Sequence, residues 1–187
     1  MSDVQGVDFD YIRYTPKWRI YKFKDPDNEV AKHMGAGGDA YKAPNAPYAV
    51  EEFPGNVALN KGLYNLIQVA AKTSGTFTKS LRWSNTYAYL YVGTHPSAAA
   101  ATQTGLLAAS ASRAKAVMDA GYPTRTSTTC KWRSTFSGTA GNIAWYEYSV
   151  RNTNTQTSGF GLNRKVATKG TKSSGESWTL ELQITFS

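Results

Sequence analysis

The sequence predicts a mainly β fold, an antiparallel β-sandwich or barrel-like domain with one amphipathic helix, preceded by an extended N-terminal arm. The last eleven residues, SWTLELQITFS, alternate between apolar and polar side chains from Trp178 onward. A period of two is typical of a half-buried strand, because successive side chains point to opposite faces of a sheet. The 187 residues include 12 Tyr, 7 Phe and 5 Trp, a composition that favours pleated surfaces over helices.

We expect residues 1–54 to form the arm and residues 55–187 to form the β-rich domain. The first segment holds five of the seven prolines and the glycine-rich stretch GAGG at 35–38, and these residues disfavour a continuous sheet or helix. It also holds aromatic and aliphatic side chains that would be costly to expose to water. We predict that they anchor the arm on a partner; the alternative is that the arm packs on its own domain. The predicted anchors are Trp18, Ile20, Tyr21 and Phe23.

One amphipathic helix is expected near residues 57–72, in the stretch NVALNKGLYNLIQVAAKT. Asn56 is a suitable N-cap, and the helix should end near Thr73 and Gly75. The apolar positions follow helical spacing and should form one buried stripe. They are Leu59, Leu63, Leu66, Ile67 and Ala70.

From residue 83 onward, strand-sized runs are separated by Gly, Ser, Thr and Asn, as in an antiparallel sandwich or barrel. The first run, residues 83–93, is apolar on both faces and should be a central strand. Residues 96–110 form either a second helix or a loop with a turn of helix. The later runs are RAKAVMDAGYPTR, CKWRSTF, NIAWYEYSVRN, LNRKVAT and the terminal strand.

The sequence does not contain a convincing catalytic or metal-binding set, so we predict no enzyme activity and no cofactor. Glycoside hydrolysis needs two carboxylates across a sugar, and only Glu147 with Asp119 would provide them. Glu176 in a turn and Glu181 on the polar face of a strand should not have a pKa raised by burial. One cysteine, Cys130, and two distant histidines cannot make a zinc site. GAGG lacks the Gly-Lys-Ser/Thr of a phosphate-binding loop.

The net charge of +8 is unevenly distributed along the chain. Residues 1–60 hold seven Lys or Arg and nine Asp or Glu, whereas residues 61–187 hold fourteen and four. The basic residues are scattered, so we expect a solvated face or a surface complementary to an acidic protein lattice, and nucleic-acid binding is disfavoured. No apolar run is long enough to span a membrane, and the acidic first residues do not resemble a signal peptide. We therefore expect synthesis in the cytoplasm and use without export.

Aromatic side chains at strand spacing would also be able to stack on bases or sugars. At such spacing they belong more often to a core or an interface, which is the interpretation we favour. These residues are Tyr87, Tyr89, Tyr91, Trp145 and Tyr148.

Six stretches of the sequence stand out: GNVALNKGLYNLI, YAYLYVG, ATQTGL, MDAGYPT, WRSTFSGTAGNIAWYEYSVRN and LNRKVATKGTKSSGESWTLELQITFS. Together they resemble a family of small virion proteins from tailed double-stranded DNA bacteriophages. The resemblance covers roughly residues 55–187, and its most specific block begins with LNRKVATKGTK at residues 162–172. The order of elements is also similar to the collar-type domain of tail fibres. The resemblance brings no catalytic residues.

This resemblance implies assembly onto a phage particle made in the host cytoplasm. We expect a capsid decoration or cement protein that binds the outside of the major capsid protein lattice and self-associates, with a trimer favoured. The alternative is a tail fibre, collar or other tail-associated protein. In either role, the aromatic arm would supply buried anchors, and Arg164 and Lys165 would orient the protein on its partner.

Overall fold

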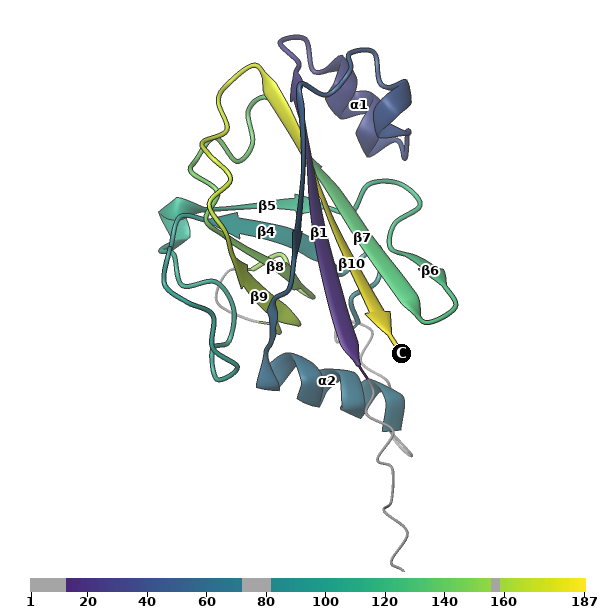
Figure 1. The fold of residues 1–187 in the computed structure, drawn as a ribbon, viewed down its shortest axis with the longest axis vertical. Coiled ribbons are helices and arrows are strands. Elements are labelled where there is room, and N and C mark those ends of the chain that lie inside the picture. Colours follow the sequence, from purple (N-terminus) through teal and green to yellow (C-terminus); the bar gives the residue numbers. More distant parts are fainter. Residues whose placement is uncertain (1–12, 72–81, 156–158) are drawn as a thin grey trace, which may run out of the picture.

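The computed structural model describes residues 13–71, 82–155 and 159–187, which form two five-stranded antiparallel sheets packed as a β-sandwich. The first sheet has the order β2-β1-β10-β7-β6, and the second has the order β3-β9-β8-β4-β5. The strands of the second sheet cross behind those of the first at a steep angle (Figure 1). The mainly β fold predicted from the sequence is therefore confirmed.

The first sheet is formed by β1 (Tyr14–Lys24), β2 (Ala49–Pro54), β6 (Thr124–Thr126), β7 (Thr129–Phe136) and β10 (Glu176–Phe186). The second is formed by β3 (Val57–Ala58), β4 (Tyr89–Gly93), β5 (Arg113–Val117), β8 (Glu147–Arg151) and β9 (Asn163–Val166). The helices are α1 (Glu29–Gly35) and α2 (Asn60–Ala71), with short 3-10 turns η1 (Ala40–Lys42) and η3 (Ser110–Ser112). Among the described residues, none of the helices combines the length and the apolar character that a membrane span requires.

The terminal strand is the central strand of the first sheet. β10 pairs along its whole length with β1, from Tyr14 opposite Phe186 to Lys24 opposite Glu176, and its other edge pairs with β7. Its apolar side chains face the second sheet, where Trp178, Leu180 and Leu182 are at most 2% exposed. The end of the chain is therefore held within its own domain by backbone pairing on both sides.

Residues 14–54 do not form an arm, and the predicted boundary at residue 54 is wrong. β1 lies inside the first sheet, between β2 and β10. Pro16 has no backbone N–H to donate, but it lies just before Lys17–Lys22, the part of β1 that is paired with β2. At Pro16 the strand is paired with β10 alone, so β1 tolerates the missing donor. Residues 1–12 lie outside the described part of the chain.

The four predicted anchors are likewise buried within the chain itself. Trp18 and Ile20 are fully buried in the core between the sheets. Tyr21 and Phe23 point to the outer face of β1, where Val30, Met34 and Ala40 of the α1–η1 segment cover them. The alternative considered from the sequence, packing on the same domain, is the correct one for these residues.

Helix α2 begins at Asn60, later than predicted, because Val57–Ala58 pair with β9 as strand β3. Leu59 is buried as expected, but Ile67 is 63% exposed and Asn65 is buried in its place. The side chain of Ala70 and the predicted end of the helix at 73–75 lie outside the described residues. Residues 96–109 contain no helix, and the single 3-10 turn η3 begins at Ser110.

The core between the sheets is rich in aromatic rings. Trp145 packs edge-on against Phe136 and Trp178, with ring centroids 4.8 and 4.9 Å apart. Trp18 packs against Phe53 and Tyr148. Each such ring pair stabilises the fold beyond the contribution of burying the two rings. Because Trp18 takes part in two of these pairs, β1 is a main contributor to the core.

Replacing Trp18 with alanine should lower the free energy of unfolding by about 3–5 kcal/mol, because it removes a fully buried ring and leaves a cavity. The measurement is chemical denaturation followed by circular dichroism. Tyr64→Ala, at an exposed position of α2, is the control and should change stability by less than about 1 kcal/mol. Equal effects of the two substitutions would contradict the central position of β1.

Candidate functional site

An arginine on the outer face of the first sheet binds the segment that covers that face. Arg133 of β7 donates from Nε to Asp119 at 2.8 Å, from Nη2 to the carbonyl of Met34 at 2.8 Å and from Nη1 to the carbonyl of Gly38 at 2.9 Å. Its guanidinium also lies 4.3 Å from the ring centre of Tyr122. One buried side chain therefore fastens the end of α1, the following loop and the β5–β6 connection to the sheet.

A second buried arginine has the equivalent role on the second sheet. Arg164 of β9 pairs with Glu147 of β8 at 2.8 Å, and both side chains are fully buried. Arg164 Nη1 donates to the carbonyls of Ser97 and Ala98, and Glu147 accepts from the backbone N–H of Ala108 at 2.7 Å. The pair fixes the long β4–β5 connection over the outer face of the sheet.

These contacts show the positions of four residues that were considered for function from the sequence. Glu147 and Asp119 lie on the outer faces of different sheets, each bound to its own arginine, so they do not form a carboxylate pair around one substrate. The prediction that Arg164 is a partner-binding surface residue is wrong, because it is fully buried. Lys165 is half-buried, donates to the carbonyl of Pro54 at 2.7 Å, and borders an open hollow of about 530 Å³ between β3, β9 and the β4–β5 connection.

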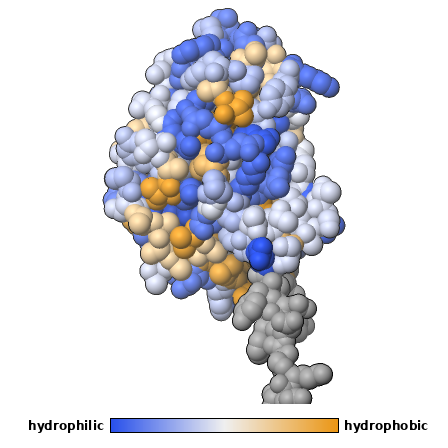
Figure 2. All heavy atoms as spheres, in the orientation of Figure 1, coloured by the Kyte–Doolittle hydropathy of each residue, from blue (hydrophilic) through white to orange (hydrophobic). Residues whose placement is uncertain are grey.

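The candidate functional site is a cleft of about 330 Å³ below α1, on the outer face of the first sheet, which we call the α1 cleft. Hydrophilic residues gather on this part of the surface, over β1, β10 and β7 (Figure 2). The floor comes from three neighbouring strands, and the walls come from the α1–η1 loop and the β5–β6 connection. Its main side chains are Tyr21, Tyr41, Tyr122, Lys131, Arg133 and Glu181.

Glu181 lies in the floor of the cleft and is only 7% exposed. Its register partners are Arg19 in β1 and Arg133 in β7, but Arg19 binds Glu52 and Arg133 binds Asp119. Within the described residues, the Glu181 carboxylate makes no hydrogen bond or ion pair, and its oxygens are open to solvent in the cleft although most of the residue is buried. Burial raises its pKa above the usual range, and Lys131, Arg133 and Arg19 offset part of that rise. The expectation that burial would not raise the pKa of Glu181 is wrong, because the α1–η1 segment encloses this part of the polar face in a cleft.

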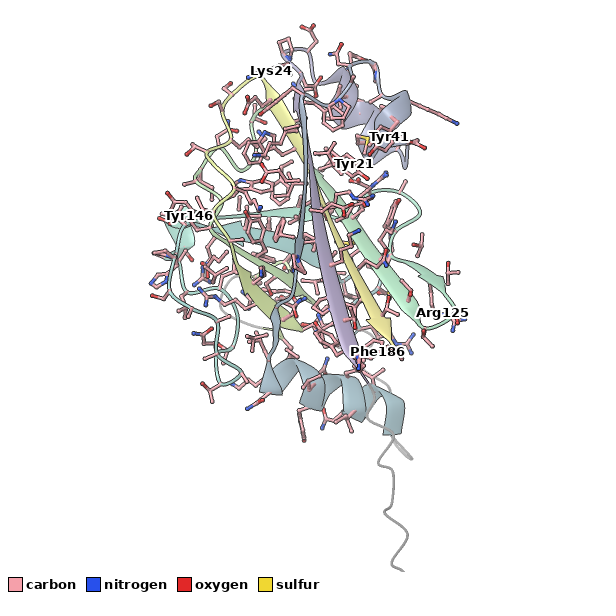
Figure 3. All side chains as sticks on the ribbon, in the orientation of Figure 1. Tyr21, Lys24, Tyr41, Arg125, Tyr146 and Phe186 are labelled. Atoms are coloured by element: carbon pink, nitrogen blue, oxygen red, sulfur yellow. The ribbon has the colours of Figure 1, made fainter. Side chains whose placement is uncertain are left out.

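Tyrosine rings form much of the wall of the α1 cleft. Tyr21 of β1 and Tyr41 of η1 lie edge to face with centroids 6.0 Å apart (Figure 3). The Tyr21 hydroxyl accepts a hydrogen bond from Arg19 Nη1 at 2.9 Å, and burial raises the pKa of Tyr21. Tyr41 is 71% exposed, so one ring at the mouth of the cleft is available to a ligand.

The glycines of GAGG shape the rim of the cleft. Gly37 has φ +89°, and a Cβ there would lie 2.7 Å from the carbonyl oxygen of Ala120. A Cβ on Gly38 would overlap the ring of His33, which itself bonds the carbonyl of Asp39 at 2.9 Å. These glycines allow the loop to pass close to its neighbours, so their role is close packing.

The structure also shows where the other residues considered for binding or reactivity lie. Tyr91, Trp145 and Tyr148 are fully buried, whereas Tyr87 and Tyr89 are half-buried. Burial raises the pKa of the Cys130 thiol in β7. Among the residues the structure describes, no cluster of three or more His, Cys, Asp or Glu could hold a metal ion. Sequence reasoning missed the α1 cleft, because its floor exists only once the register of β1, β10 and β7 is known.

Breaking the Arg164–Glu147 pair should be strongly destabilising. We expect Arg164→Met and Glu147→Gln each to lower the free energy of unfolding by about 3–5 kcal/mol, because each leaves a buried partner uncompensated. The double variant should lose less than the sum of the two, since it removes both charges. Lys17→Met, in the exposed pair with Glu52, is the control and should cost less than about 1 kcal/mol. Denaturant unfolding of the four variants tests this, and strictly additive losses would contradict a direct pair.

Glu181→Gln should stabilise the fold at neutral pH. A carboxyl group whose pKa is raised by folding stabilises the protein below its unfolded pKa, about 4.3, and that contribution is lost as the pH rises through the folded pKa. The ionised group therefore costs stability at pH 7, and its removal should gain on the order of 1 kcal/mol. The gain should shrink as the pH falls towards 4. Unfolding curves across this pH range test the prediction, and a variant less stable than the wild type at neutral pH would refute it.

Comparisons of the chain with protein-family models, with curated proteins and with solved structures find no match.

Proposed function

We propose that this chain is a non-catalytic structural protein of a tailed-phage virion, and that it decorates the outside of the capsid shell. The resemblance of residues 55–187 to small virion proteins motivates the proposal. Its most specific block, residues 162–187, supplies β9, β10 and the buried Arg164. A tail-associated structural role is the alternative, because the order of elements is also similar to a fibre collar domain.

The observation that carries the proposal is the use of charged groups inside the domain. Arg133, Asp119, Arg164 and Glu147 are all buried and bound to one another or to backbone groups of the covering connections. Catalytic carboxylates need access to a substrate and a pKa matched to their task. Here these groups fasten loops to sheets, an arrangement that favours a rigid binding protein over an enzyme.

The surface that would contact neighbouring subunits differs from the predicted arm. Helix α2 exposes Tyr64 by 61% and Ile67 by 63%, one turn apart on the same side. Hydrophobic residues also gather in the lower part of the molecule, at the level of α2 (Figure 2). Val117 is 64% exposed on β5, which is an edge strand of the second sheet. Exposed apolar side chains and open strand edges are the usual means of contact between subunits.

Weak contacts of this kind suit a protein that binds a repeating lattice. Several linked contacts bind more tightly than each one alone, and a protein that binds only the assembled shell stabilises that shell by mass action. The major capsid protein is the proposed partner, and self-association into trimers would link several contact sites. The net positive charge of +8 would favour an acidic lattice.

The proposal predicts the copy number of the chain in purified particles. Quantitative mass spectrometry should give a copy number comparable with that of the major shell protein. A number that is a small fraction of the shell protein would favour the tail, and absence from particles would refute both roles. Tyr64→Ser with Ile67→Ser should lower occupancy about tenfold when the protein is added to particles that lack it. Val50→Ser, at another exposed position on β2, is the matched control and should bind as the wild type does.

A further inference from the structure

We propose that the α1 cleft binds a neutral saccharide, with Glu181 accepting hydrogen bonds from sugar hydroxyls and Tyr41 packing against the sugar ring. This inference does not depend on the proposed virion role, because it rests on the lining of one cleft in the isolated chain. The cleft volume of about 330 Å³ lies at the small end of the range of ligand sites, roughly 300–1,000 Å³.

Glu181 is the first reason to expect a polar ligand. The side chain is more than nine-tenths buried, lines the cleft, and has no bonded partner within the described residues. The carboxylate oxygens are open to the cleft, so both can accept hydrogen bonds from a molecule bound there. Hydrogen bonds to a charged acceptor are stronger than those between neutral groups. A ligand that donates hydrogen bonds would replace the water around the carboxylate.

The charges around the cleft favour a ligand without net charge. Arg133 is neutralised by Asp119, and Arg19 by Glu52. The charges that remain are Lys131 and Glu181 on the floor and Asp39 at the rim, where its carboxylate accepts from the backbone N–H of Tyr41. An anion would meet two carboxylates, whereas a cation would meet Lys131 and the guanidinium of Arg133. An apolar ligand would leave Glu181 unsatisfied. A polyhydroxyl compound offers donors to Glu181 and acceptors to Lys131 at the same time.

The tyrosines select for a flat ligand with both polar edges and apolar faces. Tyr41 is largely exposed at the mouth and lies edge to face with Tyr21 (Figure 3). Tyr122 is held on the opposite wall by stacking with Arg133. Rings that combine an apolar face with a hydroxyl suit ligands that are apolar on one side and wet on the other. The C–H face of a pyranose has this character, so a saccharide fits better than an open-chain polyol.

The proposal can be tested with the full-length chain by following its backbone amide NMR spectrum during titration with methyl glycosides. The probes are the methyl glycosides of glucose, galactose, mannose, rhamnose and N-acetylglucosamine, with glucuronic acid and inorganic phosphate as charged comparisons. We expect at least one neutral glycoside to give saturable shifts at millimolar concentrations, centred on the amides of residues 37–41 and 181. Glucuronic acid and phosphate should bind more weakly than that glycoside.

Two variants test the assigned roles. Tyr41→Ala should weaken binding about tenfold, which corresponds to about 1.4 kcal/mol, and it should fold because Tyr41 is exposed. Glu181→Gln should weaken binding by a similar factor while keeping or raising stability. Tyr48→Ala removes a half-exposed tyrosine outside the cleft and should bind as the wild type does.

Three results would overturn the proposal. They are the absence of saturable shifts with every neutral glycoside, tighter binding of glucuronic acid or phosphate than of any neutral glycoside, and shifts that Tyr41→Ala leaves unchanged. The amide spectrum of each variant reports folding in the same experiment, so loss of binding is separated from loss of structure.

Discussion

Two buried arginines hold the irregular parts of this protein against its two sheets. Arg133 reaches from β7 to the carbonyls of Met34 and Gly38, and Arg164 reaches from β9 to the carbonyls of Ser97 and Ala98. Each is neutralised by one carboxylate, so the cost of burying the charge is offset by an ion pair and several hydrogen bonds. The long connections therefore behave as fixed layers on the sandwich, and the outer faces of both sheets become partly buried.

This constraint explains which parts of the fold the sequence could predict. The inward side of β10 follows from the alternation of Trp178, Leu180 and Leu182, because a face packed on another sheet must be apolar. The outward side of β10 does not follow from the alternation, since Glu181 and Thr179 are polar and yet buried, on the face that the α1–η1 segment partly covers. Periodicity reports which face is apolar, but it does not report which polar face another segment covers.

The misplaced arm has a related cause. Proline and glycine in residues 1–54 do disfavour long regular elements, and the segment between β1 and β2 is indeed short helix and turn. The aromatic run of β1, however, can bury its side chains equally well in its own sheet or on a partner. Local sequence does not distinguish these outcomes. The pairing with β10, more than 150 residues away, decides between them, and that contact leaves no signal in either segment alone.

The same geometry separates the two surfaces for which functions are proposed. Helices α1 and α2 lie at opposite ends of the first sheet (Figure 1), so the α1 cleft and the exposed side of α2 do not compete for space. Contact between subunits at Tyr64 and Ile67 would leave Glu181 and Tyr41 open to a ligand. Because the cleft floor is made of three paired strands and its wall is fastened by Arg133, a ligand would meet a preformed site, and its binding energy would not be spent on ordering the protein.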